Sequence, residues 1–166
     1  MRHLALMRKE SSLSAKMTEE RIVADTYARV ELFIGSEKGE KAKQVLANAD
    51  MVYTPDTVLA EIARKYLREG VGEDVIIERL KLIVKCSQVV NVNFEIAMES
   101  AKAYLELMEK AKQEKLRDPG LLDAIVLAVA RVCTAEVLTG DEHFKGLKET
   151  IWIGQDLSLS NRNKEG

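Results

Sequence analysis

Cysteine, secretory signals and long apolar runs are scarce or missing in this chain of 166 residues. Its two cysteines, Cys86 and Cys133, lie in apolar helical stretches without the spacing of a metal site, so we expect both to be small core residues in a reducing cytosol. No apolar run approaches the roughly 20 residues that cross a bilayer, and the first residues do not resemble a secretory signal. These absences predict a cytoplasmic protein without a membrane segment.

Excess positive charge and aromatic residues are also lacking. Lysine and arginine number 25 against 27 acids, a net charge of -2, so no overall basic field indicates a polyanion partner, although a local basic face would still permit one. No aromatic platform for RNA is evident, and the single tryptophan, Trp152, is predicted to be a core residue of the last strand. Composition alone therefore does not identify a partner.

What the chain does contain is enough apolar sequence for one domain. With 46% hydrophobic and 31% charged residues, it suits a single core. Residues 1–16 show no lasting periodicity and are predicted to be an N-terminal extension outside the fold. Residues 17–157 are predicted to form the domain, and residues 158–166 a polar tail.

Short β-forming runs alternate with helical patterns along this domain. Strands are predicted at 22–24, 51–54, 88–92, 136–139 and 151–153. Helices are predicted over 27–34, 37–49, 56–69, 73–86, 94–115 and 120–132, with a short one over 141–147. Asp118 and Pro119 are predicted to be the cap and first position of the helix over 120–132. Because the connections are too long for hairpins, the predicted fold class is α/β, a three-layer α/β/α sandwich with a mostly parallel five-stranded sheet.

Two aspartates directly follow predicted strands. In such sheets ligands gather beyond the carboxyl ends of the strands, where strand order reverses. Asp25 follows the first strand, where it is a helix cap, a metal ligand or both; Asp141 follows the fourth strand and, taken alone, is a turn or cap residue. If these strands are neighbours, their ends lie about 5 Å apart. Each carboxylate then raises the pKa of the other unless a cation separates them.

Asp123 and Glu61 lie on helices. Asp123 interrupts the apolar run 121–130, whose breadth predicts a helix buried on most sides. The helix dipole stabilises a first-turn carboxylate by about 0.3–1 kcal/mol, whereas burying an unpaired charge costs several kcal/mol, so Asp123 requires a compensating cation or base. Glu61 alone would be a solvated helix flank. Its helix starts where the second strand ends, which allows it to lean toward Asp25.

Four carboxylates without a converging histidine or cysteine predict an all-oxygen site. Such a donor set suits Mg²⁺ or Mn²⁺ rather than Zn²⁺. His143 is predicted to be a surface residue of the short helix after Asp141, and His3 lies in the extension. Thr26 and Thr139 can hydrogen-bond a metal-bound water or orient a carboxylate, or they are ordinary capping and strand-end residues.

Four short motifs, in this order, resemble the PIN-domain family, and within it the VapC-type ribonuclease toxins and their archaeal relatives. They are VADTYARVELF, TVLAEIARKYL, LLDAIVLAVARV and LTGDEHF, and the resemblance covers residues 22–153. It implies that the family's acidic quartet is Asp25, Glu61, Asp123 and Asp141, with Thr139 as a supporting residue. It also implies a five-stranded parallel sheet in which the first strand is central and the fourth lies beside it.

The same resemblance implies an activity. This is Mg²⁺- or Mn²⁺-dependent cleavage of single-stranded RNA, in which metal-activated water attacks a phosphodiester. Family members usually form homodimers, and the toxins pair with an antitoxin protein.

An RNA site also needs cations, because phosphate contacts provide most sequence-independent affinity. The candidates are Lys110, Lys112, Lys115 and Arg117, which precede the Asp123 helix. Arg29, one turn beyond Asp25, departs from the aromatic or aliphatic residue that relatives commonly carry; it would ion-pair with an acid or contact substrate phosphate. A second basic patch, Arg64, Lys65 and Arg68, flanks Glu61. The alternative for the lysines is a solvated helix face interleaved with glutamates.

The alternatives to a nuclease are a phosphotransfer protein on a similar sheet and a catalytically inactive module. Haloacid-dehalogenase phosphatases have a second aspartate two residues after the first, where this chain has Tyr27, and receiver domains have adjacent acids, whereas Ala24 precedes Asp25. A catalytically inactive PIN-like module that binds RNA or supports assembly stays an alternative. Such a module is expected to lose acids, and this chain retains all four.

Overall fold

The structure is a computed structural model and describes residues 18–155. The predicted extension, 1–16, and the predicted tail, 158–166, lie outside the described residues, and so does His3. Within 18–155, no helix combines the length and the apolarity needed to cross a membrane.

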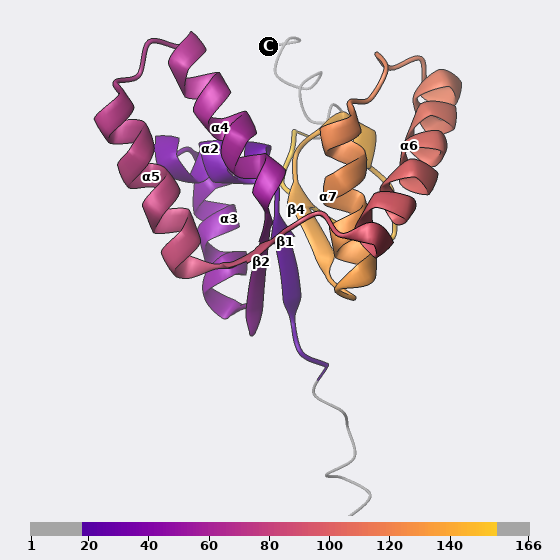
Figure 1. The fold of residues 1–166 in the computed structure, drawn as a ribbon, viewed down its shortest axis with the longest axis horizontal. Coiled ribbons are helices and arrows are strands. Elements are labelled where there is room, and N and C mark those ends of the chain that lie inside the picture. Colours follow the sequence, from indigo (N-terminus) through magenta and orange to yellow (C-terminus); the bar gives the residue numbers. More distant parts are fainter. Residues whose placement is uncertain (1–17, 156–166) are drawn as a thin grey trace, which may run out of the picture.

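Strands and helices alternate along the described residues (Figure 1). The elements are β1 (Arg21–Ala24), α2 (Thr26–Ile34), α3 (Glu37–Asn48), β2 (Met51–Pro55), α4 (Asp56–Arg68), α5 (Glu73–Cys86), β3 (Gln88–Val90), α6 (Phe94–Glu114), α7 (Leu121–Val132), β4 (Glu136–Thr139), the 3₁₀ helix η1 (Glu142–Phe144) and β5 (Thr150–Trp152). Each of the five predicted strands is present, within two residues of its predicted bounds.

The five strands form one parallel sheet in the order β3-β2-β1-β4-β5. Ile22 of β1 pairs with Val52 on one side and with Glu136 on the other. From β1 the chain moves outward to β2 and β3, then returns across β1 to add β4 and β5. Strand order therefore reverses between β1 and β4, which confirms that these two strands are neighbours. Their carboxyl ends are where a ligand site is expected.

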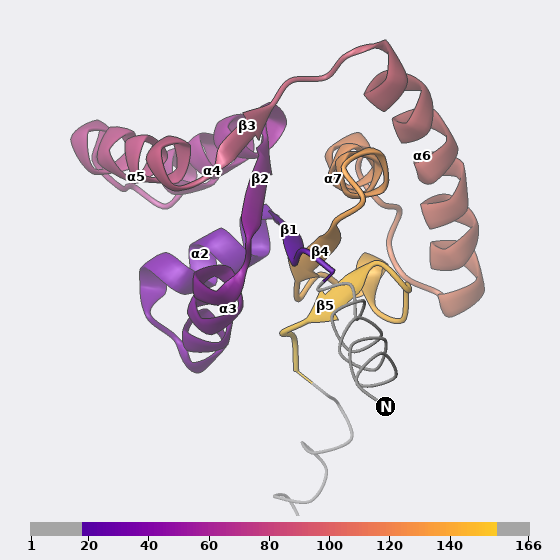
Figure 2. The same cartoon turned by 90° about the horizontal axis from the view of Figure 1, so that it is seen from below.

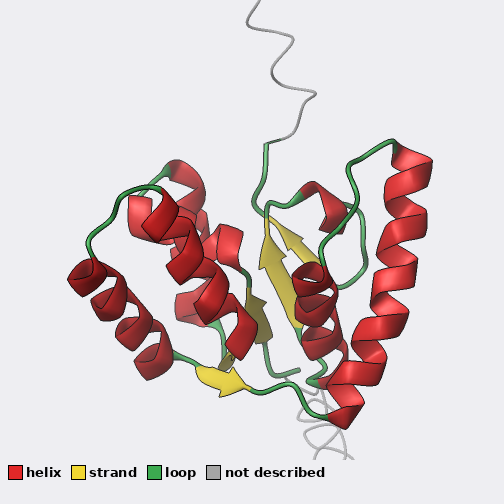
Figure 3. Ribbon diagram, turned by 45° about the horizontal axis from the view of Figure 1, so that its top comes forward, coloured by secondary structure: helices red, strands yellow, loops and turns green. Residues whose placement is uncertain are grey.

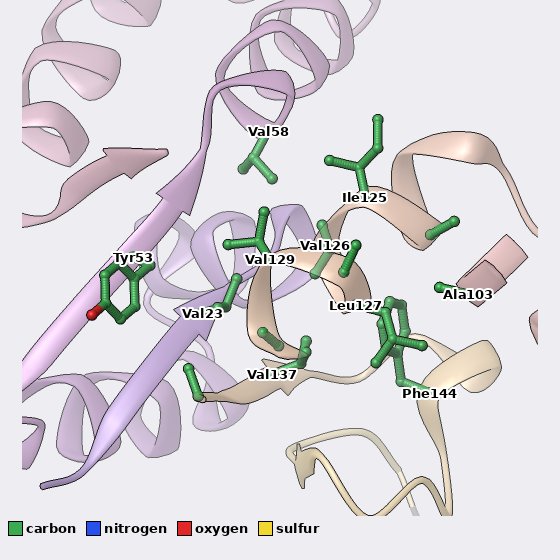
Figure 4. Packing of buried hydrophobic residues seen from close by; sticks show 14 of the residues in the cluster. Val23, Tyr53, Val58, Ala103, Ile125, Val126, Leu127, Val129, Val137 and Phe144 are labelled. Atoms are coloured by element: carbon green, nitrogen blue, oxygen red, sulfur yellow. The ribbon is translucent and has the colours of Figure 1, made fainter. Parts of the chain in front are cut away.

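Helices cover both faces of the sheet (Figures 2 and 3). Successive side chains of a strand point to opposite faces, and β1 shows this directly. Ile22 packs with Ala28 of α2 and Ala42 of α3, whereas Val23 joins the larger core beneath α4 and α7. In that core Val23 lies near Val129 of α7 (Figure 4). The predicted three-layer α/β/α sandwich is confirmed.

Three local predictions were wrong. The helix over 141–147 is only the 3₁₀ turn η1, and α7 begins after Gly120 rather than after Asp118, because the Asp123 carboxylate accepts a hydrogen bond from the Gly120 N–H at 2.8 Å. Cys86 is exposed at the end of α5 and is not a core residue, whereas Cys133 is half-buried and packs against the main core. Since α5 is an outer helix that buries only a narrow stripe, residues beside that stripe face solvent.

Candidate metal centre

All four predicted carboxylates line one cavity of about 280 Å³. We call it the acidic cavity. Asp25 reaches it from the end of β1 and Asp141 from just beyond β4, whereas Glu61 comes from α4 and Asp123 from the first turn of α7. The cavity lies where strand order reverses, so four distant parts of the sequence meet at one edge of the sheet.

Asp25 is both a helix cap and a wall of the acidic cavity. Its Oδ1 accepts a hydrogen bond from the Ala28 N–H at 2.9 Å, which caps α2, and its Oδ2 accepts one from the Thr139 hydroxyl. The side chain is only 6% exposed. Burial raises the pKa of Asp25 to about 7, against the opposing effect of these two hydrogen bonds, and the charges of Asp141 and Asp123 raise it further.

Asp123 has a local structural role as well. Its bond to the Gly120 N–H satisfies one of the amides that the start of α7 leaves free. Burial raises the pKa of Asp123, and the charges of Asp141 and Glu61 add to that shift, while His143 opposes it. The sequence predicted a carboxylate that needs a compensating charge. The structure shows a half-buried one, with an oxygen within 4.8 Å of a ligand atom of Asp141 and of His143.

His143 is the clearest error of the sequence analysis at this site. It was predicted to be a surface residue, yet it is 4% exposed. Its Nδ1 lies 2.7 Å from Asp141 Oδ1, and its Nε2 lies 2.8 Å from the Arg117 carbonyl oxygen, to which it must donate. Burial lowers the pKa of His143, but the bonds to Arg117 and Asp141 and the charges of Asp141 and Asp123 outweigh that effect, so the pKa is raised.

Both predicted supporting threonines hold a carboxylate. The Thr26 hydroxyl donates to Glu61 Oε2 at 2.5 Å, and Thr139 donates to Asp25 while accepting from the Asp141 N–H at 3.0 Å. These contacts orient the acids without neutralising them. Arg64 approaches Glu61 at 4.0 Å from an exposed position, where an ion pair contributes little.

Arg29 does not face the acidic cavity, which corrects its prediction as a phosphate contact. It is 3% exposed, and one of its terminal nitrogens donates to the Thr54 hydroxyl at 2.9 Å. Burial lowers the pKa of Arg29 to about 10. Because it lies on the side of α2 that packs toward β2, its guanidinium is enclosed by protein and does not reach a phosphate.

The other predicted RNA-binding residues lie around the end of α6. Lys110 pairs with Glu114 at 2.7 Å, whereas Lys112, Lys115 and Arg117 are exposed. The Arg117 carbonyl is bonded to His143, so this loop is tied to the acidic cavity through its backbone. Their role in binding RNA stays a prediction.

The second predicted patch surrounds Glu61. Lys65 lines the acidic cavity and pairs with Glu69 at 2.6 Å, while Arg64 and Arg68 are exposed. Of the predicted cations, Lys65 is the one that lines the acidic cavity.

The residues present fit a hard divalent cation. Single ligand atoms of Asp123, Asp141 and His143 lie within 4.8 Å of one another. Both ring nitrogens of His143 are engaged by Asp141 and Arg117, so the carboxylate oxygens are the free donors. Oxygen donors suit Mg²⁺ or Mn²⁺. The raised pKa values of Asp25 and Asp123 show that their ionised forms are disfavoured, and a bound cation would stabilise these forms.

A PIN domain family model matches residues 22–149 of this chain. Three solved structures share its fold. A chain of a toxin-antitoxin complex from Klebsiella pneumoniae superposes with a TM-score of 0.60 at 19% identity, over 81% of this chain and 99% of that chain. VapC20 of Mycobacterium tuberculosis, a sarcin-ricin loop cleaving toxin, gives 0.59 at 20% identity over 77% and 95%. DNA-bound VapBC from Salmonella typhimurium gives 0.62 at 12% identity over 81% and 98%. No curated protein matches in sequence.

Proposed function

Since this chain belongs to the PIN-domain family, we propose that it is a divalent-metal-dependent endoribonuclease that cleaves single-stranded RNA. The observation that carries the proposal is the acidic cavity, in which Asp25, Glu61, Asp123 and Asp141 converge at the switch point of a parallel sheet. Mg²⁺ or Mn²⁺ is the cofactor that this donor set suits.

The side chains around the cavity are held in place before any ligand arrives. Asp25 is fixed by the Ala28 amide and the Thr139 hydroxyl, and Glu61 by Thr26. A cation bound among these oxygens would make water a stronger nucleophile and stabilise the charge that develops on the phosphate oxygens. Preorganised ligands are valuable because they need no reorganisation at the moment of reaction.

Asp141 differs from the other acids because it contacts a histidine. The imidazole lies between the Asp141 carboxylate and the Arg117 carbonyl, so it fixes the orientation of Asp141 and links it to the loop before α7. Through this contact His143 positions the carboxylate, in the way that partners of metal ligands commonly do.

We extend the proposal to a biological role, the toxin of a toxin-antitoxin pair that acts in the cytoplasm. Support comes from the solved structures with the same fold, which include a toxin-antitoxin complex and DNA-bound VapBC. The two structures are only 19% and 12% identical to this chain, so they support a common fold and no more. The antitoxin partner and a homodimeric state belong to this part of the proposal.

The test is cleavage of a mixture of end-labelled single-stranded RNAs by the purified chain. We expect cleavage with Mn²⁺ or Mg²⁺, none with a chelator in excess, and recovery when the cation is restored. Asp141→Asn is expected to remain inactive under every condition. If the wild-type chain binds the RNAs in a gel-shift assay but never cleaves them, the inactive RNA-binding module becomes the better description.

A further inference from the structure

A second cavity, of about 420 Å³, lies beside the acidic cavity. Tyr27 lines both cavities, and Gly140 and Glu142, which line the second, are the two chain neighbours of Asp141. The remaining wall includes Trp152 at the end of β5. We call this cavity the aromatic pocket. A substrate strand that extends from the carboxylates past Tyr27 would therefore enter the aromatic pocket.

Two glycines allow the aromatic rings of the pocket to lie close to the backbone. A Cβ at Gly140 would come within 2.3 Å of the Tyr27 ring, and a Cβ at Gly154 within 2.2 Å of the Trp152 ring. Any side chain at either position would displace a ring. Trp152 was predicted to be a core residue, but it is only half-buried because it ends the edge strand β5, and one part of it faces the pocket.

Two lysines accompany the two rings. Lys38 donates a hydrogen bond to the Tyr27 hydroxyl at 2.8 Å, and the ammonium group of Lys145 lies 5.2 Å from the centre of the Trp152 ring. The Trp152 Nε1 is buried and has no hydrogen-bond partner among the described residues. The pocket thus combines π faces and cations.

We infer that the aromatic pocket binds one nucleotide of the single-stranded RNA substrate, next to the scissile phosphate, with its base on Trp152 and its backbone phosphate near Lys38 and Lys145. This inference rests on the proposed function, because the acidic cavity defines the scissile phosphate. Stacking on aromatic rings together with a basic track for the backbone is how proteins bind single strands without reading their sequence.

The charges of the pocket favour a nucleotide over a simple anion. Glu142 and Glu114 also line it, and Glu114 is paired with Lys110 at 2.7 Å. Carboxylates repel a free phosphate, but they accept hydrogen bonds from the amino groups of a base. In the free protein the Lys145 ammonium lies over the Trp152 ring. A base would take that place on the indole ring.

Trp152 itself provides the first readout, because it is the only tryptophan of the chain. The cleavage-deficient Asp123→Asn variant is titrated, in the presence of chelator, with a short mixed-sequence oligoribonucleotide and with an abasic ribose-phosphate oligomer of equal charge. We expect saturable quenching of tryptophan fluorescence by the oligoribonucleotide alone, because only a base stacks on the indole. Equal quenching by both oligomers, or none by either, would overturn the inference.

Substitutions provide the second readout, the affinity for labelled RNA measured by fluorescence anisotropy. Trp152→Ala is expected to weaken binding by about 5- to 150-fold, the range for loss of one stacked base, and Trp152→Phe to retain most of it. Lys38→Gln is expected to reduce the magnitude of the slope of log affinity against log salt by about 0.7, the value for one phosphate contact to a single strand. The matched control is Lys41→Gln, on the same helix beside Glu37, which leaves affinity unchanged apart from the long-range effect of charge.

The two proposals can fail separately. If the wild-type chain never cleaves RNA but Trp152 is quenched by oligoribonucleotides, the nuclease proposal fails and the pocket stands as a nucleotide site. If the wild-type chain cleaves RNA and Trp152→Ala does so with unchanged KM and unchanged melting temperature, the pocket does not bind substrate.

Discussion

The two ends of α7 carry two clusters of acidic residues that are built in opposite ways. At its start, Asp123 faces three other carboxylates in the acidic cavity. At its end, Arg131 contacts Glu99 at 3.3 Å, Glu106 at 2.7 Å and Glu149 at 3.0 Å. The second cluster contains its own cation, which links α7 to α6 and to the segment before β5.

The two clusters differ in how their negative charge is compensated. Acids around Arg131 are compensated within the chain, and the guanidinium supplies several donors in a fixed geometry. In the acidic cavity, hydroxyl and amide groups orient the carboxylates, and burial raises the pKa of both Asp25 and Asp123. The groups of opposite sign at the acidic cavity are His143, which is bonded to Asp141, the exposed Arg64, 4.0 Å from Glu61, and Lys65, which pairs with Glu69 outside the quartet. The cluster around Arg131 is a structural cross-link, whereas the acidic cavity has the properties of a site prepared for a cation.

The largest expected effect separates the clusters by activity. Asp123→Asn should reduce kcat/KM for RNA cleavage by about 10³-fold or more, because it removes a charged oxygen from the proposed metal centre. The matched change in the other cluster is Glu106→Gln, on α6 beside Arg131, and it should leave the rate within about twofold. Initial rates on a labelled single-stranded RNA, with saturating Mn²⁺, provide the measurement. A similar loss of kcat/KM in both variants would show that the acidic cavity contributes no more to cleavage than the Arg131 cluster does.

The next effect concerns stability without metal. Asp25→Asn should raise the free energy of unfolding above about pH 7, since asparagine caps a helix as well as aspartate and carries no buried charge. The raised pKa of about 7, compared with about 4 in the unfolded chain, sets an upper limit of roughly 4 kcal/mol. Urea denaturation in excess chelator measures it. Loss of stability in this variant would show that Asp25 is mainly a structural cap.

The same shift predicts the direction of the pH dependence. An acid whose folded pKa lies above its unfolded value favours the fold while it is protonated, so that contribution is complete below about pH 4 and is lost as pH rises to about 7. The stability difference between Asp25→Asn and wild type should therefore grow across this window and level off above it. A difference that is constant from about pH 4 to 8 would contradict the raised pKa.

A site residue could be predicted from the sequence when the residues that identify it lie close to it in the chain. Asp25 and Asp141 were found because each follows a β-forming run directly, and Asp123 because it interrupts an apolar stretch. These signals lie within a few residues of the site itself. The sheet order that brings them together came from the family resemblance.

Residues whose surroundings come from distant segments were misjudged. His143 is enclosed by the loop that carries Arg117, 26 positions earlier in the chain. Arg29 is buried against Thr54, 25 positions later. The setting of Trp152 depends on Tyr27 and Lys38, which share its pocket. No pattern near these three residues encodes such contacts, so their exposure could not be predicted from the sequence.

A smaller effect of the opposite sign is expected at the far end of α7. Arg131→Gln leaves three glutamates without their common partner and should lower the free energy of unfolding by about 1–3 kcal/mol, a range discounted because the side chain is 22% exposed. Lys41→Gln, which removes an exposed cation, is the control. Urea denaturation at neutral pH measures both. An unchanged stability would remove the distinction between the two clusters.

The smallest expected effect is the response of each cluster to a divalent cation. A ligand that binds only the folded state at ten times its Kd stabilises it by about 1.4 kcal/mol, which corresponds to an increase in Tm of about 3–6 °C for a chain of this size. Wild type and Arg131→Gln should show this increase with MnCl₂, and Asp25→Asn should not, because Asp25 is one of the carboxylates that would hold the cation. Sodium chloride at equal ionic strength controls for screening, which acts on every variant alike. An equal increase in Tm with Mn²⁺ for Asp25→Asn and wild type would show that the cation binds outside the acidic cavity. The acidic cavity would then be a structural feature and not a metal site.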